Sequence, residues 1–337
     1  MRTASSRVRQ HRGTDRTRQD ENDPGEGFVG DREQTLPLTG AEHDRAAHHR
    51  LDEAWLAAAW EAPETRVLVI EQGKVHWRDI GPEDGGPGLV LRGTADAPEG
   101  ERYFLGVEPD GTAHFAVAAA ALPEVPDDAG IQVGHLYTLG SVLGDRDAGL
   151  LVHALGLENW HRTHGFCSRC GQPSEPTAAG HVRKCTVCAT EHFPRTDPAV
   201  IMLLVDPQDR ALLGRQPSWP EKRFSTLAGF VEPGESLRQA VVREVAEEVG
   251  AQVVDVAYVD SQPWPFPSSL MLGFHATAAD DHVDVDGMEI AEARWFTREE
   301  LGAAVDAGEI LLPGGISISR RLVELWYGKP IAESNKW

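Results

Sequence analysis

The stretch LAGFVEPGESLRQAVVREVAEEVGA, residues 227–251, joins a loop containing glycine and proline to an amphipathic segment rich in glutamate. Ser236 followed by Gln239 has the spacing of a capping box, in which two side chains satisfy free backbone groups at a helix start. Gly250 suits the end of that helix, because glycine readily adopts the left-handed conformation of a C-terminal cap. The sequence therefore predicts a helix between Ser236 and Gly250.

The glutamates of this helix are divided between two faces. At about 100° per residue, the valines share one face, and Arg243 and Glu247 lie opposite them. Glu244 and Glu248 instead fall about 20° to either side of Leu237, at the margin of the apolar face. Carboxylates four residues apart repel each other, and a divalent cation removes that repulsion. Oxygen ligands without Cys or His nearby indicate Mg²⁺ or Mn²⁺, with Glu247 as a third ligand, directly or through water.

The loop before the helix fits the same purpose. Gly229 and Gly234 permit a tight turn, and Pro233 stiffens it. This loop brings Glu235 to the start of the helix, where we expect Arg243 to hold its carboxylate. The alternative for Arg243 is an ordinary solvated surface arginine.

All the cysteines of the chain lie in one segment, as C-x2-C-x14-C-x2-C: Cys167, Cys170, Cys185 and Cys188. Two such pairs offer four thiolates to one tetrahedral Zn²⁺. Because four protein ligands leave no open coordination position, we predict one structural zinc ion per chain. Unpaired core cysteines or a redox pair are the alternatives.

Composition restricts the partners of the chain. The 337 residues suffice for two or three domains, and the formal net charge is -21. Such a charge disfavours bulk, sequence-independent binding to nucleic acid, although a nucleotide or an RNA end can still enter a local pocket. No apolar run reaches the roughly 20 residues of a membrane span, and the start lacks the core of a signal peptide. We therefore expect a cytoplasmic protein with reduced thiols and no membrane partner.

Four segments differ in their patterns. The first is polar and predicts a disordered tail, with a nucleic-acid-binding arm as the alternative. The second has short alternating runs between turns, which predict a β-rich domain with a linking helix over 147–164. The last combines strands with the glutamate helix and two final helices that begin near Thr297 and Ser317. The predicted segments are a tail (1–45), a β-rich N-terminal domain with its linking helix (46–160), a zinc ribbon (161–197) and a C-terminal α/β domain (198–330).

The stretch SQPWPFPSSLM, residues 261–271, contains three prolines among aromatic residues. Proline lacks the N–H that a central strand needs, so we expect a rigid loop. Such a loop presents Trp264 and Phe266 for stacking on planar rings. The alternative is a turn that packs both aromatic side chains into the core.

Two of these segments resemble a known family. The Nudix box G-x5-E-x7-R-E-U-x-E-E-x-G-U, in which U is usually a bulky aliphatic residue, is matched by Gly229, Glu235, Arg243, Glu244, Val245, Glu247, Glu248 and Gly250, with Ala251 smaller than usual at the last position. The pattern SQPWPFPxS from Ser261 to Ser269, together with the preceding zinc ribbon, is similar to the NADH pyrophosphatase subfamily of the Nudix hydrolases. The resemblance implies an α/β/α sandwich of the Nudix type, after a four-cysteine zinc ribbon and the β-rich N-terminal domain.

The resemblance also implies roles for individual residues. Glu244, Glu247, Glu248 and Glu289 correspond to ligands of two or more Mg²⁺ or Mn²⁺ ions, and Glu235 and Arg243 complete the catalytic set. Phe230 stands where an aromatic ring stacks on a base, and Ser319 where a backbone contact is expected. Phe193 replaces a tyrosine of the family, which puts any hydroxyl contact there in doubt. The remaining implied substrate-binding residues are Gln262, Pro263, Trp264, Pro265, Phe266, Pro267, Ser268 and Ser269.

The implied reaction is metal-assisted hydrolysis of the pyrophosphate of NADH or NAD⁺, giving AMP and the reduced or oxidised nicotinamide mononucleotide. The family also implies a homodimer and the removal of NAD caps from RNA 5′ ends. One alternative is a Nudix hydrolase that prefers ADP-ribose or another dinucleotide. The other is a non-catalytic nucleotide- or RNA-binding protein with a zinc ribbon, in which we would expect a metal-binding glutamate to be missing.

Overall fold

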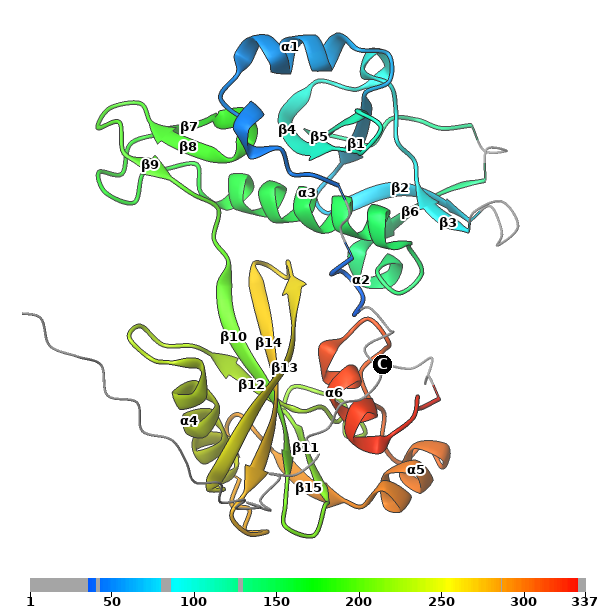
Figure 1. Cartoon of the computed structure of the whole chain (residues 1–337), viewed down its shortest axis with the longest axis vertical. Coiled ribbons are helices and arrows are strands. Elements are labelled where there is room, and N and C mark those ends of the chain that lie inside the picture. Colours follow the sequence, from blue (N-terminus) through cyan, green and yellow to red (C-terminus); the bar gives the residue numbers. More distant parts are fainter. Residues whose placement is uncertain (1–35, 41–42, 80–85, 127–129, 286, 333–337) are drawn as a thin grey trace, which may run out of the picture. The chain divides into compact units, whose positions relative to one another are not determined.

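The structure, a computed structural model, describes residues 36–40, 43–79, 86–126, 130–285 and 287–332 (Figure 1). Most of the predicted tail, residues 1–35 and 41–42, lies outside these ranges. Within them, Leu36 and Leu38 are buried, and the backbone of Asp44 pairs with that of Val107. A solvated tail therefore does not extend to residue 45. Its end packs into the fold, and an apolar segment this short has no periodicity from which its burial could be predicted.

The part of the chain before the cysteines contains two three-stranded sheets, which confirms the predicted β-rich character. One sheet has the strand order β1–β5–β4 and the other β3–β2–β6. The strands are β1 (Arg66–Ile70), β2 (Lys74–Asp79), β3 (Pro87–Leu89), β4 (Gly100–Val107), β5 (Ala113–Ala119) and β6 (Ile131–His135). The helices are α1 (Glu53–Glu61), α2 (Leu136–Leu139) and α3 (Asp145–Thr163), with short 3-10 turns at Ala47–His49 and Thr94–Asp96. Helix α3 matches the predicted linking helix, whereas α1, α2 and β6 were not predicted.

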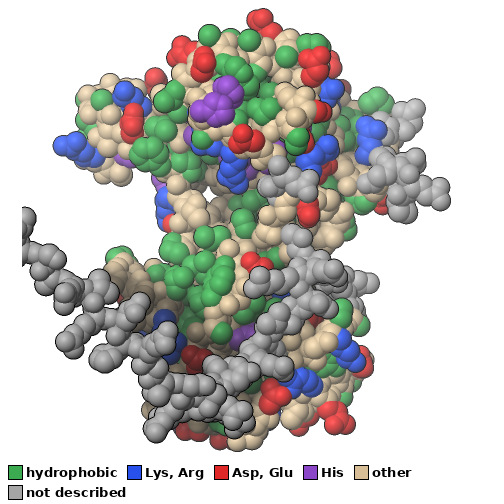
Figure 2. Space-filling view, viewed as in Figure 1, with side chains coloured by type: hydrophobic (Ala, Val, Ile, Leu, Met, Phe, Trp, Pro, Cys, Tyr) green, Lys and Arg blue, Asp and Glu red, His purple; other side chains and the backbone are tan. Residues whose placement is uncertain are grey.

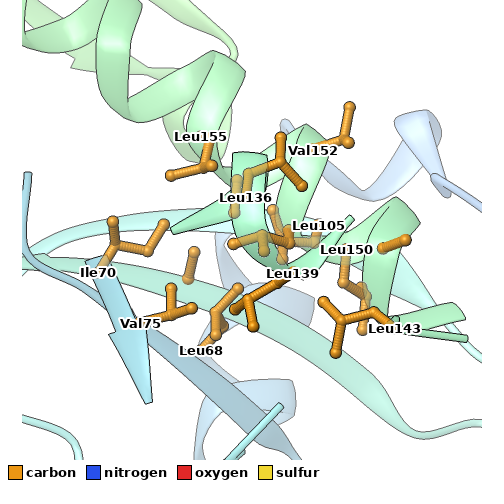
Figure 3. Packing of buried hydrophobic residues seen from close by; sticks show 14 of the residues in the cluster. Leu68, Ile70, Val75, Leu105, Leu136, Leu139, Leu143, Leu150, Val152 and Leu155 are labelled. Atoms are coloured by element: carbon orange, nitrogen blue, oxygen red, sulfur yellow. The ribbon is translucent and has the colours of Figure 1, made fainter. Parts of the chain in front are cut away.

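A single apolar core holds α2 and α3 against these sheets (Figure 3). Leu68 and Ile70 of β1 belong to the same cluster as Leu136 of α2 and Leu150 of α3. Each fully buried leucine or isoleucine contributes about 1.5–3 kcal/mol relative to an exposed one. The positions of α2 and α3 are therefore fixed by packing.

The four cysteines lie in and beside a small separate sheet. Its order is β7–β8–β9, with β7 (Ser174–Thr177), β8 (Val182–Cys185) and β9 (Glu191–His192), and a 3-10 turn at Ala178–Gly180. Cys185 ends β8, and Cys167, Cys170 and Cys188 lie in the turns next to its strands. Two-residue and four-residue strands bury little apolar surface, so this sheet needs a further source of stability.

The C-terminal part is an α/β/α sandwich, as predicted. Its sheet has the order β13–β14–β10–β11–β15, with β12 paired to β10. Side chains of β10 alternate between two cores, Val200 and Met202 toward α4 and Ile201 and Leu203 toward α5 and α6. The helices accordingly cover opposite faces of the sheet (Figure 1). The elements are β10 (Asp197–Val205), β11 (Ala211–Arg215), β12 (Leu227–Phe230), α4 (Leu237–Val249), β13 (Val253–Trp264), β14 (Ser269–Ala278), β15 (Glu292–Phe296), α5 (Arg298–Asp306) and α6 (Ile318–Tyr327).

The proline-rich stretch is not a loop along its whole length. Strand β13 continues through Pro263 to Trp264, which pairs with Ser269 of β14, and only residues 265–268 form the connecting turn. The prediction of a loop over 261–271 is therefore wrong in extent. Strand β13 lies at the sheet edge, where a proline breaks no essential ladder bond.

The surface is mixed in charge. Figure 2 shows acidic and basic side chains scattered over the visible face, for a chain whose formal net charge is -21. Among the described residues, none of the helices has the length and apolar character required to cross a membrane.

Candidate active site and zinc site

Helix α4 begins and ends where the sequence predicts. The Ser236 side chain accepts from the backbone N–H of Gln239, and the Gln239 side chain accepts from the N–H of Ser236. Gly250 closes the helix with φ of 65°, in the left-handed region. The caps thus fix the ends of α4, and its buried valines turn one side toward the sheet.

Three carboxylates gather beside this helix. Glu244 and Glu248 are 7% and 3% exposed, which agrees with their predicted position at the apolar margin. Glu289 joins them from the segment before β15, and a ligand oxygen from each lies within 4.8 Å of the others. Around an ion with Mg–O distances of about 2.1 Å, ligand oxygens lie roughly 3–4 Å apart. With small side-chain adjustments, these residues fit a Mg²⁺ or Mn²⁺ ion.

Arg243 organises the acidic residues around this group. Its Nε and Nη2 donate to the two carboxylate oxygens of Glu235, both at 2.9 Å, which is the pairing expected from the sequence. Its Nη1 donates to Glu244 at 2.8 Å and to Glu247 at 2.9 Å. Nη2 also donates to the Phe230 carbonyl, so Arg243 ties the loop to the helix. In this arrangement the Glu247 carboxylate is hydrogen-bonded to Arg243 and does not belong to the group of Glu244, Glu248 and Glu289.

The local environment shifts the acidities of these groups in opposite directions. Burial raises the pKa of Glu244, which the adjacent Arg243 partly offsets and the neighbouring Glu247 and Glu289 reinforce. The bond from Arg243 lowers the pKa of Glu235, and the same bond raises the pKa of Arg243. Glu235 is therefore a fixed charge, whereas Glu244 gains from a nearby cation.

Gly229 leaves room for the carboxylate of Glu244. A Cβ at this position would lie 2.0 Å from the carboxyl carbon of Glu244. No side chain fits there unless Glu244 moves. The first glycine of the box is thus explained by close approach, because its neighbour is a carboxylate.

A cavity of about 250 Å³ extends from Glu248. Trp264 and Gln262, two of the predicted substrate-binding residues, line it. The Gln262 amide is fully buried: its nitrogen donates to the carbonyls of Pro37 and Ile316, and its oxygen accepts from Ile318 N–H. Its side chain is thus committed to holding the cavity wall.

The polar wall of the cavity combines Ser319, which the family resemblance singles out, with Ser225 and Thr226, which no sequence pattern singles out. The Ser319 hydroxyl lies 2.8 Å from the Ser225 hydroxyl and 2.9 Å from that of Thr226. All three side chains are buried. Trp219 and Tyr137 add aromatic surface to the lining. Their segments carry no motif, so only tertiary structure brings them together.

The other predicted substrate residues lie outside the cavity lining. Phe230 ends β12 and is 59% exposed, and Phe193 is 63% exposed after β9. Phe266 is partly exposed in the turn and contacts Trp264 edge-on, with ring centroids 5.1 Å apart. The Ser268 hydroxyl donates to Asp197. Pro263 and Ser269 lie at the strand ends, and Pro265, Pro267 and Ser268 in the turn between them.

The four cysteine sulfurs converge as the spacing predicts. Cys170 Sγ lies 3.5 Å from Cys185 Sγ and 3.4 Å from Cys188 Sγ, and Cys167 Sγ lies 3.6 Å from Cys188 Sγ. A zinc tetrahedron with Zn–S bonds of about 2.3 Å has sulfurs roughly 3.8 Å apart. The four side chains therefore fit a closed zinc site with little movement.

Local donors favour the thiolate form at two of the four cysteines, Cys185 and Cys188. At Cys170 the Gln172 backbone lowers the pKa, but the Cys188 and Cys185 sulfurs outweigh it and raise the pKa. The Thr190 hydroxyl and N–H lower the pKa of Cys188 to about 6. Backbone N–H groups of Cys188 and Val187 lower the pKa of Cys185. Because the thiolate is the form that binds zinc, these groups prepare the site for the metal.

Known protein families match the two segments of the chain that contain these sites. The NUDIX domain family matches residues 195–312, and the NADH pyrophosphatase zinc ribbon domain family matches residues 162–193. The NAD-capped RNA hydrolase NudC of Mycobacterium bovis is 42% identical over 297 residues, covering 84% of this chain and 92% of that protein. The NudC of Stutzerimonas stutzeri is 43% identical over 180 residues, covering 53% of this chain and 62% of that protein. A solved NUDIX hydrolase from Nitrosomonas europaea is 25% identical, with a TM-score of 0.38, and the match covers 49% of this chain and 94% of that one.

Both domain families match in the predicted order, and the identity to the Mycobacterium bovis protein extends over most of both chains. The chain therefore belongs to the NADH pyrophosphatase subfamily of the Nudix hydrolases, whose members carry a zinc ribbon before the Nudix domain.

Proposed function

We propose that this protein hydrolyses the pyrophosphate of NADH and NAD⁺, giving AMP and the reduced or oxidised nicotinamide mononucleotide. One observation carries the proposal: the group formed by Glu244, Glu248 and Glu289 adjoins a cavity that is lined by Trp264. Carboxylates that bind divalent cations suit a diphosphate, and an aromatic wall suits a base. In the reaction, the oxygen of a water molecule bonds to one phosphorus and the bond from that phosphorus to the bridging oxygen breaks.

The residues of the site divide this work. Glu244, Glu248 and Glu289 would hold Mg²⁺ or Mn²⁺, with Glu247 as a further ligand after it leaves Arg243. When bound, such ions neutralise the diphosphate and activate water. Arg243 keeps Glu235 and the loop in place through its paired hydrogen bonds. One glutamate of the set accepts the proton of the attacking water.

Aromatic residues would bind the bases. Trp264 and Phe266 present their rings at the end of the β13–β14 hairpin, and Phe230 is exposed beside the loop that precedes α4. Stacking on aromatic rings contributes about 1–3 kcal/mol per base in nucleic-acid-binding proteins. The cavity and Phe230 thus offer two surfaces for the two ends of a dinucleotide.

NAD-capped RNA is the second substrate that we propose. The curated relatives at 42% and 43% identity are named NAD-capped RNA hydrolases. The formal net charge of -21 argues that the RNA chain itself contributes little through its phosphates. The cap would then supply most of the recognition, with Phe193 and the zinc ribbon near the RNA.

We further propose a cytoplasmic homodimer. Four free thiols that serve as zinc ligands suit a reducing compartment. Family membership favours the dimer, and exposed Val254 and Tyr258 on edge strand β13 provide apolar surface for a partner. The segment boundaries 1–45, 46–160, 161–197 and 198–330 remain our proposal for the domains, with the described end of the first segment packed into the fold.

Turnover of four substrates at one Mg²⁺ concentration tests the function. We expect the highest kcat/KM with NADH, NAD⁺ or NAD-capped RNA, and release of AMP or of 5′-monophosphorylated RNA. ADP-ribose should be a poorer substrate, because it lacks the nicotinamide ring. A clear preference for ADP-ribose would replace this proposal with a different Nudix specificity. Binding without turnover of any of the four would indicate a nucleotide-binding protein that is not an enzyme.

A further inference from the structure

The aromatic turn between β13 and β14, residues 265–268, extends beyond the sheet. Backbone pairing of the two strands ends at Trp264 and Ser269. The turn contains Pro265 and Pro267, which have no N–H to donate. Inside the turn, Phe266 N–H donates to the Trp264 carbonyl at 2.7 Å, and on the β10 side Asp197 N–H donates to the Ser268 carbonyl at 2.8 Å. Contacts from outside the hairpin therefore contribute to its position.

One such contact comes from helix α3 of the N-terminal part. The side-chain nitrogen of Asn159 lies 3.1 Å from the carbonyl oxygen of Pro265 and 3.4 Å from that of Pro267. The side-chain oxygen of Asn159 accepts from Arg162 Nη2 at 2.9 Å. A guanidinium can only donate and a carbonyl can only accept, so these partners fix the orientation of the amide. The NH₂ group of Asn159 thus points at both carbonyls of the turn.

A second contact comes from helix α2. The ring of Tyr137 meets Trp264 edge-on, with centroids 6.2 Å apart, and meets Phe266 in the same manner at 6.0 Å. These distances and angles suit favourable aromatic pairs. Tyr137 also lines the cavity that adjoins Glu248. Trp264 in turn packs against the N-terminal core that holds α2 and α3.

We propose that the N-terminal domain positions the substrate-binding aromatic residues, through Asn159 on the turn carbonyls and Tyr137 on the rings. This inference rests on the proposed function, because it assumes that Trp264 and Phe266 stack on a base. It gives the N-terminal domain a role in substrate affinity, distinct from the chemistry at the glutamates. Asn159 is a positioning residue, which acts through the turn and does not touch the reacting atoms.

Asn159→Asp is the sharpest test, because it keeps the size of the side chain and replaces the NH₂ donor by an oxygen that faces two carbonyls. We expect KM for NADH to rise about 5- to 10-fold while kcat stays within about twofold, since the metal-binding carboxylates are untouched. Thr163→Ala is the matched control: among the residues that the structure describes, the hydroxyl of this exposed residue of the same helix bonds within α3 and to His164. Its kinetic constants should equal those of the wild type.

A double-mutant cycle separates positioning from general destabilisation. In a Trp264→Ala background, Asn159→Asp should change KM less than twofold further, because the ring that it positions is gone. Amide hydrogen exchange should be faster in the 264–270 segment of Asn159→Asp than of Thr163→Ala. Full additivity of the two substitutions, or an unchanged KM in Asn159→Asp, overturns the inference. Failure of the wild type to hydrolyse NADH would instead overturn the proposed function, and exchange in the turn would still report whether Asn159 anchors it.

Discussion

At the scale of single residues, the glycine that starts the Nudix box is determined by its carboxylate neighbour. Gly229→Ala would place a Cβ 2.0 Å from the carboxyl carbon of Glu244, so this carboxylate must leave its position. We expect a fall in kcat of at least about 100-fold and a higher Mg²⁺ requirement, with the helix content preserved. Steady-state kinetics at several Mg²⁺ concentrations measure kcat and the Mg²⁺ requirement, and circular dichroism measures the helix content.

Gly156→Ala provides the control for that substitution. Gly156 lies within α3, and a Cβ there would have no neighbouring atom within 4 Å. Alanine in a helix interior is more favourable than glycine by about 0.5–1 kcal/mol. This variant should be fully active and slightly more stable. Normal Mg²⁺ dependence in Gly229→Ala would show that Glu244 is not held where the reaction needs it.

Glu248 tests the metal-binding role more directly. It is 3% exposed and shares the three-carboxylate group with Glu244 and Glu289. Glu248→Gln keeps the volume but removes a charge that interacts with the metal, so kcat should fall by several orders of magnitude. Kd for NADH should stay within about tenfold, roughly 1.4 kcal/mol, because the aromatic residues remain.

Stability distinguishes this effect from misfolding. Without added metal, Glu248→Gln should unfold at no lower a urea concentration than the wild type, since one of two repelling carboxylates is removed. Turnover close to that of the wild type, in a folded variant, would exclude Glu248 from the catalytic centre.

Without the family resemblance, which adds Glu289, the sequence predicts those site residues that a local pattern relates to one another. Helical periodicity was enough to place Glu244 and Glu248 at the apolar margin, and charge complementarity indicated the pair of Arg243 and Glu235. Trp219 and Tyr137 reach the cavity from segments that lie far apart in the chain. Nothing in their local sequence indicates this, because long-range packing decides it.

At the scale of helices and strands, the elements with end signals were predictable. Capping boxes at Ser236 and Thr297 identify the starts of α4 and α5, and both boxes are formed in the structure. No sequence pattern predicts helix α1, although Asp52 caps it, because exposed alanines obscure the apolar face on which Trp55, Leu56, Ala59 and Trp60 pack. The prolines predict a loop where β13 ends, but β13 is an edge strand, which tolerates proline where a central strand does not.

The junction between the zinc ribbon and β4 predicts a dependence of stability on pH. His181, just before β8, is buried and bonds through Nε2 to the Phe104 carbonyl at 2.7 Å. Burial lowers its pKa to about 4, and Arg50, Arg45 and His161 add to this effect against the Phe104 bond. His153 is adjacent, with ring centroids 5.3 Å apart, and burial also lowers its pKa.

The direction of this pH dependence follows from the number of protons that each state binds. Between pH 6.5 and about 4, the unfolded chain binds a proton at His181 that the folded chain does not. The contribution of neutral His181 to the free energy of unfolding is therefore fully present above pH 6.5 and is lost as the pH decreases through this range. For His181 alone, the loss is about 2 kcal/mol at pH 5. In urea unfolding, the free energy of unfolding should differ less between pH 7.5 and pH 5 for His181→Gln than for the wild type. Exposed His48→Gln is the control, and an equal difference in all three proteins contradicts the assignment.

At the scale of the whole molecule, the two candidate metal sites are built on different physical principles. The ribbon strands bury little, so four thiolates around a zinc ion would replace the missing core. The carboxylate group rests on a sandwich whose two cores exist without any metal. Zinc should therefore stabilise the fold, and Mg²⁺ or Mn²⁺ should affect activity with little effect on stability.

If zinc is structural and Mg²⁺ or Mn²⁺ is catalytic, zinc content and activity should respond differently to a chelator. Purified protein should contain about one Zn²⁺ per chain, and an EDTA wash should abolish activity without removing that zinc, since the closed thiolate site exchanges its metal slowly. Added Mg²⁺ or Mn²⁺ should restore turnover, and added Zn²⁺ should not. Metal analysis, NADH hydrolysis and thermal unfolding of the same samples measure all three responses.

Two substitutions make the test reciprocal. Cys188→Ser removes one thiolate, so zinc content and the melting temperature should both fall. Glu289→Gln should retain about one zinc ion and the wild-type melting temperature but need more Mg²⁺ for half-maximal activity, because it removes one of three carboxylates. If Glu289→Gln lost zinc, or if zinc alone restored the activity of EDTA-washed protein, the thiolate site would belong to catalysis and the separation of roles would be wrong. Zinc content, melting temperature and Mg²⁺ dependence are measured for both variants, although each variant alters one site. General unfolding would change all three measurements together, so it cannot explain the pair of results.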